Sequence, residues 1–418
     1  MDDACVNPAN GKPQSVECLH GKDACLSESD EEKLGVATRL VEAGRRPDLT
    51  GPFVNPPVVR ASTVLFDTVA DMNSGNAPYT YGRRGTPTIV ALENALTSIT
   101  ADAAGTVICP SGLSALTTTA FAFIEAGCHM LLPDCVYGPY RHFADTMLTR
   151  LGIAVEYYDA IAGAAGIEGR LRPDTRLIHV ESPGSNTFEV VDLPAIVALA
   201  KRSDAFVVVD NTWATPLFHQ PLALGADVMV LSATKYVGGH ADIMLGTATA
   251  NERAYKQLRN THGANGTTAG PDDIYLALRG LRTMKVRLDR HQESALTVAR
   301  WLLDRPEVAA VLHPSLFNGQ GHTIWQRDFT GSSGLFAFIL GGWSEAEAAA
   351  FLDGLHHFGL GYSWGGFESL AILVSRDLKR TATPWRPAGP VIRMHVGLED
   401  PADLIADLEQ ALTRAKPR

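Results

Sequence analysis

Short apolar segments that alternate with stretches of helical periodicity constrain the fold of this chain more than any other feature. There are seven of them, at residues 106–109, 129–132, 155–158, 177–180, 206–209, 228–231 and 246–249. Buried strands separated by helices predict an α/β fold with a doubly wound, mainly parallel, seven-stranded sheet. No GxGxxG motif follows the first segment, which counts against a dinucleotide-binding fold.

The chain of 418 residues is long enough for more than one domain. We expect a disordered tail at 1–28 and an N-terminal arm with a loop at 29–85. The predicted sheet defines a large domain at 86–275, and mixed strand and helix patterns define a smaller α+β domain at 276–418. At the boundary between these two domains, the pattern over residues 274–303 predicts one long helix.

Composition excludes several kinds of partner. A net charge of −10 argues against nucleic acid or an anionic membrane. No apolar segment approaches the roughly 20 residues that a membrane span needs. The N-terminal sequence MDDACVNPAN is acidic and lacks an apolar core, so we expect a cytoplasmic protein.

The six cysteines show no paired CxxC spacing, so we expect no metal site. Cys109, Cys128 and Cys135 lie in or beside apolar segments, which is typical of buried, unreactive thiols. The other three lie in the polar N-terminal tail.

Polar residues follow the fifth and sixth apolar segments directly. Asp210 ends the fifth, and the sixth leads into Ser232, Thr234 and Lys235. Because ligands bind at the carboxyl ends of parallel strands, we expect these side chains to share one crevice. The lysine would hold an aldehyde cofactor as a Schiff base, the carboxylate would keep a pyridinium nitrogen protonated, and the hydroxyls would bind a phosphate. Taken singly, an exposed lysine and a helix-capping aspartate would be the ordinary interpretation.

The stretch 232–240, SATKYVGGH, resembles the lysine segment of the pyridoxal-phosphate enzymes of cysteine and methionine metabolism, the trans-sulfuration enzymes. The resemblance extends over roughly residues 35–418. It implies a fold-type I pyridoxal-phosphate transferase with pyridoxal 5'-phosphate as cofactor and residues 86–275 as the cofactor-binding domain. It also implies an amino-acid substrate and self-association, as a dimer with shared sites and further as a tetramer.

The resemblance assigns further cofactor contacts. Gly112 and Leu113 follow the first segment in a small-residue turn at a helix start, where free N–H groups and the helix dipole suit a phosphate. Tyr137 would stack on the cofactor ring and take part in catalysis. Tyr81 and Arg83, in the loop YTYGRRGTPT, would contact the phosphate of the neighbouring subunit, and Tyr81 also the substrate. Without the resemblance, Tyr137 would be a core tyrosine and the other two surface residues.

The resemblance places substrate contacts in the second domain. Arg393 stands in an apolar alternation, where an unpaired guanidinium is costly, so it needs an anion. The resemblance implies that Arg393 binds the α-carboxylate of the substrate through two hydrogen bonds. The alternative is that Arg393 forms a structural salt bridge. Ser363 and Trp364 would also contact substrate, with an ordinary core position as the alternative for Trp364.

Two local motifs bear on the reaction. Residues 363–366, Ser-Trp-Gly-Gly, and 183–186, Pro-Gly-Ser-Asn, resemble the cystathionine beta-lyase branch, whereas γ-acting relatives have Ser-Leu-Gly-Gly and Pro-Thr-Asn-Pro. This implies a carbon–sulfur lyase of methionine biosynthesis that converts cystathionine to homocysteine, pyruvate and ammonia, with Lys235 as the base that removes the α-proton. Cystathionine gamma-synthase or gamma-lyase chemistry, and a cofactor-binding regulator without turnover, are the alternatives.

Overall fold

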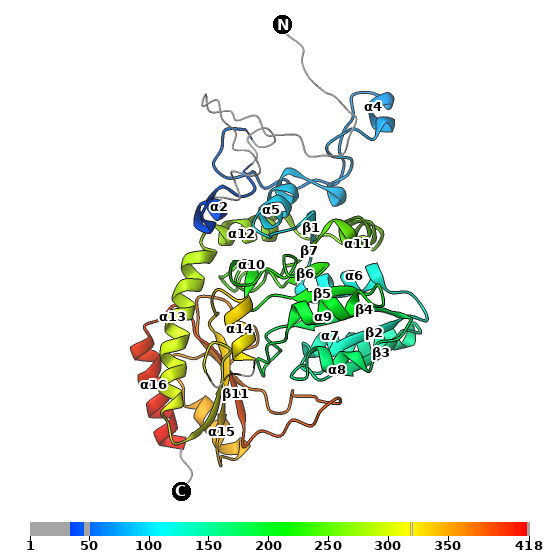
Figure 1. The fold of residues 1–418 in the computed structure, drawn as a ribbon. Coiled ribbons are helices and arrows are strands. Elements are labelled where there is room, and N and C mark those ends of the chain that lie inside the picture. The colour runs from blue at the N-terminus through cyan, green and yellow to red at the C-terminus, as the bar shows by residue number, and fades with distance from the viewer. Residues whose placement is uncertain (1–33, 46–50, 318, 320, 416–418) are drawn as a thin grey trace.

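The structure is a computed structural model, and it describes residues 34–45, 51–317, 319 and 321–415. The tail expected at 1–28 lies outside these residues. Within them the chain forms a seven-stranded sheet and a separate four-stranded sheet (Figure 1).

The large sheet has the order β1-β7-β6-β5-β4-β2-β3. Its strands are β1 (Gly105–Cys109), β2 (His129–Pro133), β3 (Ala154–Tyr158), β4 (Thr175–Glu181), β5 (Phe206–Asp210), β6 (Val228–Leu231) and β7 (Gly246–Ala250). Strands β3, β2, β4, β5 and β6 pair in parallel, and β7 runs antiparallel to both of its neighbours. Each strand coincides with one of the seven predicted segments, which confirms the α/β fold class.

Helices cover both faces of the large sheet. They are α5 (Pro87–Ser98), α6 (Gly112–Phe123), α7 (Gly138–Phe143), the π-helix η2 (Ala144–Leu148), α8 (Ala164–Glu168), α9 (Leu193–Ala200), α10 (Thr215–Phe218), α11 (Glu252–Ala264) and α12 (Pro271–Arg282). On β1 the side chain of Ile108 joins the apolar cluster on one face, and those of Val107 and Cys109 join the cluster on the other. This alternation follows from the two-residue period of a strand and explains why a strand covered on both faces has apolar residues at successive positions.

The second sheet is antiparallel, with the order β10-β11-β9-β8. Its strands are β8 (Val308–Leu312), β9 (Leu335–Leu340), β10 (Leu370–Leu373) and β11 (Val391–His395), and its helices are α13 (Met284–Leu303), α14 (His322–Asp328), α15 (Glu345–Asp353) and α16 (Pro401–Ala415). Buried side chains of α13, α15 and α16 form one apolar core with this sheet. The domain boundary near residue 275 stays a prediction.

The prediction of one continuous helix over 274–303 is wrong, because α12 ends at Arg282 and α13 starts at Met284. The buried side chain of Arg287 donates to the carbonyl of Gly280 at 2.8 Å and to the hydroxyl of Thr283 at 3.2 Å. Arg287 therefore takes over a carbonyl that a continuous helix would use. The break lets α12 pack against α5 while α13 runs on towards the small sheet (Figure 1).

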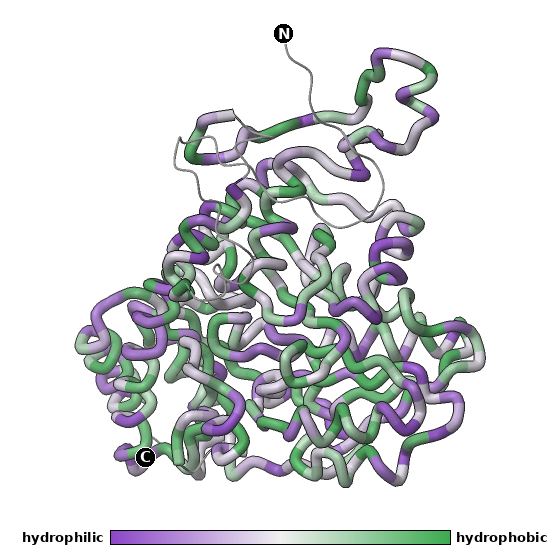
Figure 2. Tube along the Cα trace, turned by 45° about the horizontal axis from the view of Figure 1, so that its top comes forward, coloured by the Kyte–Doolittle hydropathy of each residue, from purple (hydrophilic) through white to green (hydrophobic). Residues whose placement is uncertain are grey.

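The N-terminal part of the described chain stands out from the body. Helix α2 (Val36–Glu42) lies against it, whereas residues 51–68 lack regular secondary structure and lead into α4 (Val69–Ser74) and the 3-10 turn η1 (Gly82–Arg84). Several large apolar side chains of this arm are exposed, among them Phe53 and Leu65. Figure 2 shows hydrophobic stretches on the projecting segment.

Other expectations concern thiols and membranes. Cys109, Cys128 and Cys135 are buried and free, as predicted, and burial raises the pKa of Cys109 to about 12. No helix in the described ranges is both long and apolar enough to cross a bilayer. Those ranges also contain no group of three or more His, Cys, Asp or Glu side chains that could hold a metal ion.

Candidate active site

A cavity of about 950 Å³ lies at the carboxyl edge of the large sheet and is closed on its other side by the second domain. The loops after β1, β2, β4, β5 and β6 line one wall. The other wall consists of residues 362–364, 376–380 and Arg393. The cavity therefore brings together the crevice predicted at the sheet edge and the substrate contacts predicted in the second domain, which are Ser363, Trp364 and Arg393.

Lys235 reaches across this cavity. Its amine Nζ donates to Ser363 Oγ at 2.6 Å and lies 5.3 Å from the ring centroid of Trp364. The pKa of Lys235 is lowered to about 8, mainly by burial and also by the positive charge of Arg393, while the charge of Asp210 acts in the opposite direction. A lysine with a lowered pKa has more of the neutral amine, the form that can attack a carbonyl or accept a proton.

Asp210 ends β5, and its carboxylate is held by Thr212. Its Oδ1 atom accepts from the Thr212 amide at 3.0 Å and from the Thr212 hydroxyl at 2.6 Å. Burial raises the pKa of Asp210, while the bonds from Thr212 and the charge of Lys235 oppose that rise. Thr212 was missed by the sequence reasoning. The available signal was the spacing Asp-x-Thr, since an aspartate commonly bonds the amide two residues on.

The start of α6 forms the end of the cavity that suits an anion. Ser111 caps the helix by accepting from the Ser114 amide at 3.1 Å, and Gly112 and Leu113 follow in the first turn. A Cβ atom on Gly112 would lie 2.6 Å from the Cβ of Ser232, so only glycine allows the two loops to approach. The Ser232 amide donates to the Thr212 hydroxyl at 2.9 Å.

Thr234 lines the same cavity, but its hydroxyl is already engaged. It donates to the carbonyl of Leu245 at 3.1 Å and accepts from the Leu245 amide at 3.0 Å. Its role as a phosphate ligand stays a prediction.

Tyr137 lies at the cavity between the ends of β2 and β4. Its amide donates to Glu181 Oε2 at 2.7 Å, so this buried glutamate fixes the start of the loop that carries the ring. Burial raises the pKa of Tyr137, and the charges of Asp210 and Glu181 add to the effect. Burial also raises the pKa of Glu181 well above its usual range. Glu181 was not among the predicted site residues, although its position directly after a buried strand was a usable signal.

Arg393, on β11, points into the cavity from the second domain. Its guanidinium donates to Asn186 Oδ1 and to the carbonyl of Ser363, both at 3.3 Å. Burial lowers the pKa of Arg393 to about 10. Within the described part of the chain it forms no ion pair with a carboxylate, which favours an anionic ligand over a structural salt bridge.

The loop that carries Ser363 and Trp364 has an unusual backbone. Ser363 has φ 84° and Gly365 has φ 87°, and a Cβ on Gly365 would lie 3.0 Å from the backbone of Lys235. A non-glycine residue at positive φ is strained, and such residues concentrate at functional sites. Trp364 is half-buried and packs 5.5 Å from the ring of Tyr236, so it forms part of the cavity wall rather than of the core interior.

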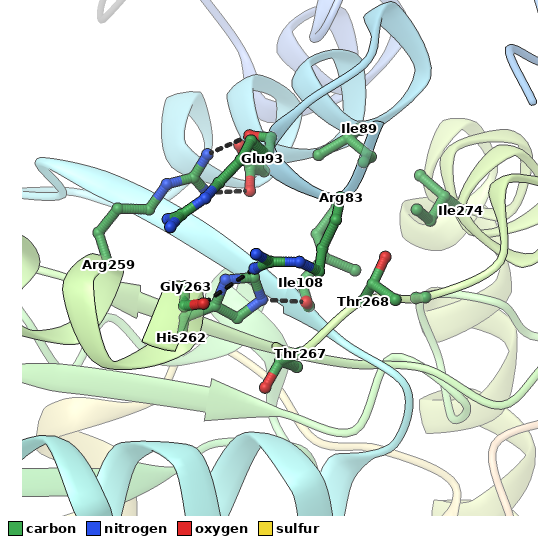
Figure 3. Close-up of a pocket in the computed structure, with 12 residues that line it drawn as sticks. Arg83, Ile89, Glu93, Ile108, Arg259, His262, Gly263, Thr267, Thr268 and Ile274 are labelled. Atoms are coloured by element: carbon green, nitrogen blue, oxygen red, sulfur yellow. Dashed lines mark hydrogen bonds and ion pairs between the residues drawn. The ribbon is translucent and has the colours of Figure 1, made fainter. Parts of the chain in front are cut away.

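Tyr81 and Arg83 are not brought to the cavity of their own chain. Arg83 lies in a separate pocket of about 30 Å³, beside Arg259 and His262, and donates to the carbonyl of Gly263 at 2.8 Å (Figure 3). Tyr81 is exposed. Their assignment to the site of a neighbouring subunit stays a prediction.

Residues 37–413 match the family model described as Cys/Met metabolism PLP-dependent enzyme, and the chain belongs to this family. It is 50% identical over 401 residues to a putative cystathionine beta-lyase of Rhizobium johnstonii, covering 95% of this chain and 99% of that protein. It is 42% identical to the cystathionine beta-lyase MetC of Escherichia coli, covering 90% and 98% of the two chains.

The fold is similar to solved structures of the same size. The crystal structure of metB from Corynebacterium glutamicum superposes with a TM-score of 0.86 at 31% sequence identity, covering 92% of this chain and 99% of that one. Family membership makes pyridoxal phosphate the cofactor, and its three polar parts find suitable groups here. The start of α6 suits the phosphate, the half-buried Asp210 carboxylate suits the ring nitrogen, and the Lys235 amine suits the aldehyde.

Proposed function

We propose that this protein is a carbon–sulfur lyase that cleaves cystathionine at its β-carbon, giving homocysteine, pyruvate and ammonia in methionine biosynthesis. The observation that carries the proposal is the cavity shared by Lys235, with its lowered pKa, and Arg393, which forms no ion pair with a carboxylate of the described residues. The names of the Rhizobium and Escherichia coli relatives support cystathionine as substrate.

The geometry gives each residue a distinct task. Arg393 would bind the substrate α-carboxylate through its planar fork, with Asn186 and the Ser363 carbonyl keeping the guanidinium in place. When bound, pyridoxal phosphate supplies the aldehyde that takes the substrate amine and a ring that accepts electrons from the α-carbon. Asp210 would hold a proton on the ring nitrogen, and its fixed contacts with Thr212 keep its carboxylate aimed.

Lys235 would act as the general base. Its Nζ atom accepts the α-proton of the substrate, and Ser363 Oγ, at 2.6 Å, orients the amine while it does so. The bond between the β-carbon and sulfur then breaks with its electron pair on sulfur, and the proton held by Lys235 can neutralise the departing thiolate. Removal of the α-proton from a bound amino acid therefore needs no base other than this lysine.

The preference for β-elimination over γ-elimination rests on two parts of the cavity wall, Trp364 and the motif 183–186. A γ-elimination requires a further proton transfer at the β-carbon, so the base must reach the β-carbon as well as the α-carbon. Trp364 stands beside the Lys235 amine and narrows the cavity there. The motif 183–186 lies on the opposite side and differs from that of γ-acting relatives.

Self-association belongs to the same proposal. The exposed apolar side chains of the arm, Phe53 and Leu65 among them, suit burial against a second copy. Arg83 lies outside its own cavity, so it is available to complete the phosphate site of that copy. A dimer with shared sites follows, whereas the tetramer and the cytoplasmic location stay predictions from the sequence.

Product analysis tests the proposal. The holoenzyme is incubated with L-cystathionine and the keto acid is identified by mass, with the Lys235→Ala variant as control. We expect pyruvate with homocysteine from the wild type alone. Mainly 2-oxobutyrate with cysteine would show γ-cleavage, and cofactor binding without any product would show a regulator.

A further inference from the structure

Residues 376–383, between β10 and β11, form a segment that we call the strap. The segment leaves the small sheet and crosses to the large domain (Figure 1, orange). It lacks regular secondary structure, and residues 376–380 line the cavity described above. The strap is therefore a part of the cavity wall that neither sheet provides.

A buried carboxylate in the large domain holds the strap in place. Asp134 Oδ2 accepts from the amides of Thr381 and Ala382, both at 2.7 Å. Arg141 donates to Asp134 Oδ1 at 2.9 Å and to the carbonyl of Lys379 at 3.2 Å. These bonds fix the backbone of the strap to the loop after β2, which also carries Tyr137.

Arg380 ties the strap to a second loop. Its guanidinium donates to the Asp134 carbonyl at 2.9 Å, to the Thr187 hydroxyl at 2.5 Å and to Glu189 Oε1 at 3.3 Å. Thr187 and Glu189 follow β4, next to Asn186, the partner of Arg393. The strap is thus held at two sheet loops, and the side chains just before this anchor have a defined position at the cavity.

Those side chains carry charge. Arg376 is paired with Glu345, and Lys379 donates to Asp145 at 3.1 Å. Asp377 is exposed at the cavity and makes no side-chain hydrogen bond or ion pair among the described residues. Asp377 therefore lines the cavity with the one strap charge that makes no hydrogen bond or ion pair among the described residues.

The position of Asp377 relative to Arg393 defines what it can bind. Asp377 and Arg393 line the same cavity, and the negative charge of Asp377 is the first of those that oppose the effect of burial on the pKa of Arg393. An amino acid held at Arg393 by its α-carboxylate uses only part of a cavity of about 950 Å³. The rest of such a ligand extends into a cavity whose wall includes the strap.

We propose that Asp377 is a specificity-determining residue that binds a second ammonium group, at the distal end of a thioether carrying an amino acid at each end. This inference rests on the proposed function. It adds a distal subsite that selects cystathionine-like substrates over cysteine conjugates without a distal amine. Asp377 contributes to binding only and takes no part in the proton transfers at Lys235.

The test compares two ligands that differ in one group. L-cystathionine carries the distal ammonium, and S-(3-carboxypropyl)-L-cysteine has the same chain without it. For Asp377→Asn holoenzyme we expect the KM for cystathionine to rise about fivefold, as for an exposed charge pair, with kcat unchanged. The KM for the analogue should stay within about twofold of wild type. Asp353→Asn, an exposed acid of α15 outside the cavity, is the matched control.

Calorimetric titration of both ligands into Lys235→Ala protein loaded with pyridoxal phosphate, with and without Asp377→Asn, gives a readout independent of turnover. If Asp377→Asn lowered the affinity for both ligands equally, or for neither, the proposed subsite would be overturned. Failure of the proposed function looks different, because wild type would then release pyruvate from neither thioether. In that case the calorimetric difference between cystathionine and the analogue still decides the role of Asp377.

Discussion

The amine nitrogen Nζ of Lys235 lies 2.6 Å from the hydroxyl oxygen Oγ of Ser363, although the residues are 128 positions apart. Lys235 follows β6 of the large sheet, and Ser363 precedes β10 of the small one. The hydrogen bond therefore joins the two domains at the centre of the cavity.

Replacing Lys235 by Ala should abolish covalent attachment of the cofactor and lower kcat by a factor on the order of 10²–10⁴, as expected for loss of a general base. Borohydride reduction of the wild-type holoenzyme, followed by peptide mapping, should place the label on Lys235. Finding the label on Lys256, another lysine of the large domain, would remove Lys235 from the centre of the mechanism.

The rate at which the cofactor-free protein captures pyridoxal phosphate should depend on pH. The neutral amine of Lys235 is the reacting form, and burial lowers its pKa to about 8. The capture rate should therefore rise through about pH 8 and level off above it, instead of rising up to the range of an ordinary lysine. Stopped-flow absorbance of cofactor uptake measures this, and a rate still climbing at pH 10 would contradict it.

Replacing Arg393 by Ala should raise KM strongly and leave the absorbance of the bound cofactor unchanged. Truncating one partner of a buried charge-assisted pair costs on the order of 2–5 kcal/mol. Arg393→Lys should recover part of this loss, since a point charge cannot reproduce the planar fork. Arg202→Ala, at a surface pair with Glu168, is the control, and a normal KM for Arg393→Ala would make this arginine structural.

Mixed dimers test whether sites are shared. Arg83→Ala and Lys235→Ala should each be inactive or weak alone, because each dimer would contain two defective sites. A dimer with one subunit of each variant should regain activity, since one site would combine an intact Arg83 with an intact Lys235. Differently tagged subunits allow the mixed dimer to be purified, and no recovery in that fraction would count against the crossing loop.

Asp134→Asn should destabilise the protein by about 2 kcal/mol, because it removes a buried charge that accepts several hydrogen bonds. Burial acts to raise the pKa of Asp134, but bonds from Arg141 and the strap amides outweigh it and hold the pKa below its usual range. The folded form therefore gains stability above the unfolded pKa of about 4 and loses it as pH falls below that value.

Urea unfolding at several pH values measures both effects. The difference between wild type and Asp134→Asn should shrink as the pH is lowered through 4. Asp353→Asn, an exposed acid on the second domain, should show neither effect. A difference that is independent of pH would mean that Asp134 acts through packing alone.

The sheet was predictable because its strands are short, mostly apolar segments that are each followed by a recognisable turn. The same pattern brought Asp210 and Lys235 to one crevice, as the structure shows. The functional roles of these side chains rest on the resemblance and await the experiments above. The contact between Lys235 and Ser363 was beyond sequence reasoning, because it depends on how two domains dock and on a positive φ at Ser363.

The strap was also beyond prediction. Its sequence RDLKRTAT has no apolar periodicity, and its position depends on Asp134, some 240 residues earlier in the chain. The break at Thr283 was missed for a related reason. A continuous helical pattern gives no sign that Arg287 will take up the carbonyl of Gly280.

The assembly of this cavity has a consequence for the order of events on the ribosome. The seven strands and the helices that cover them are complete once residue 282 has been made, and domains commonly fold as their residues emerge. At that moment Lys235 and Asp210 are in place, but Ser363, the strap and Arg393 have not yet been synthesised. A nascent chain can thus present its aldehyde-reactive lysine to the solvent before it has any means of selecting an amino acid.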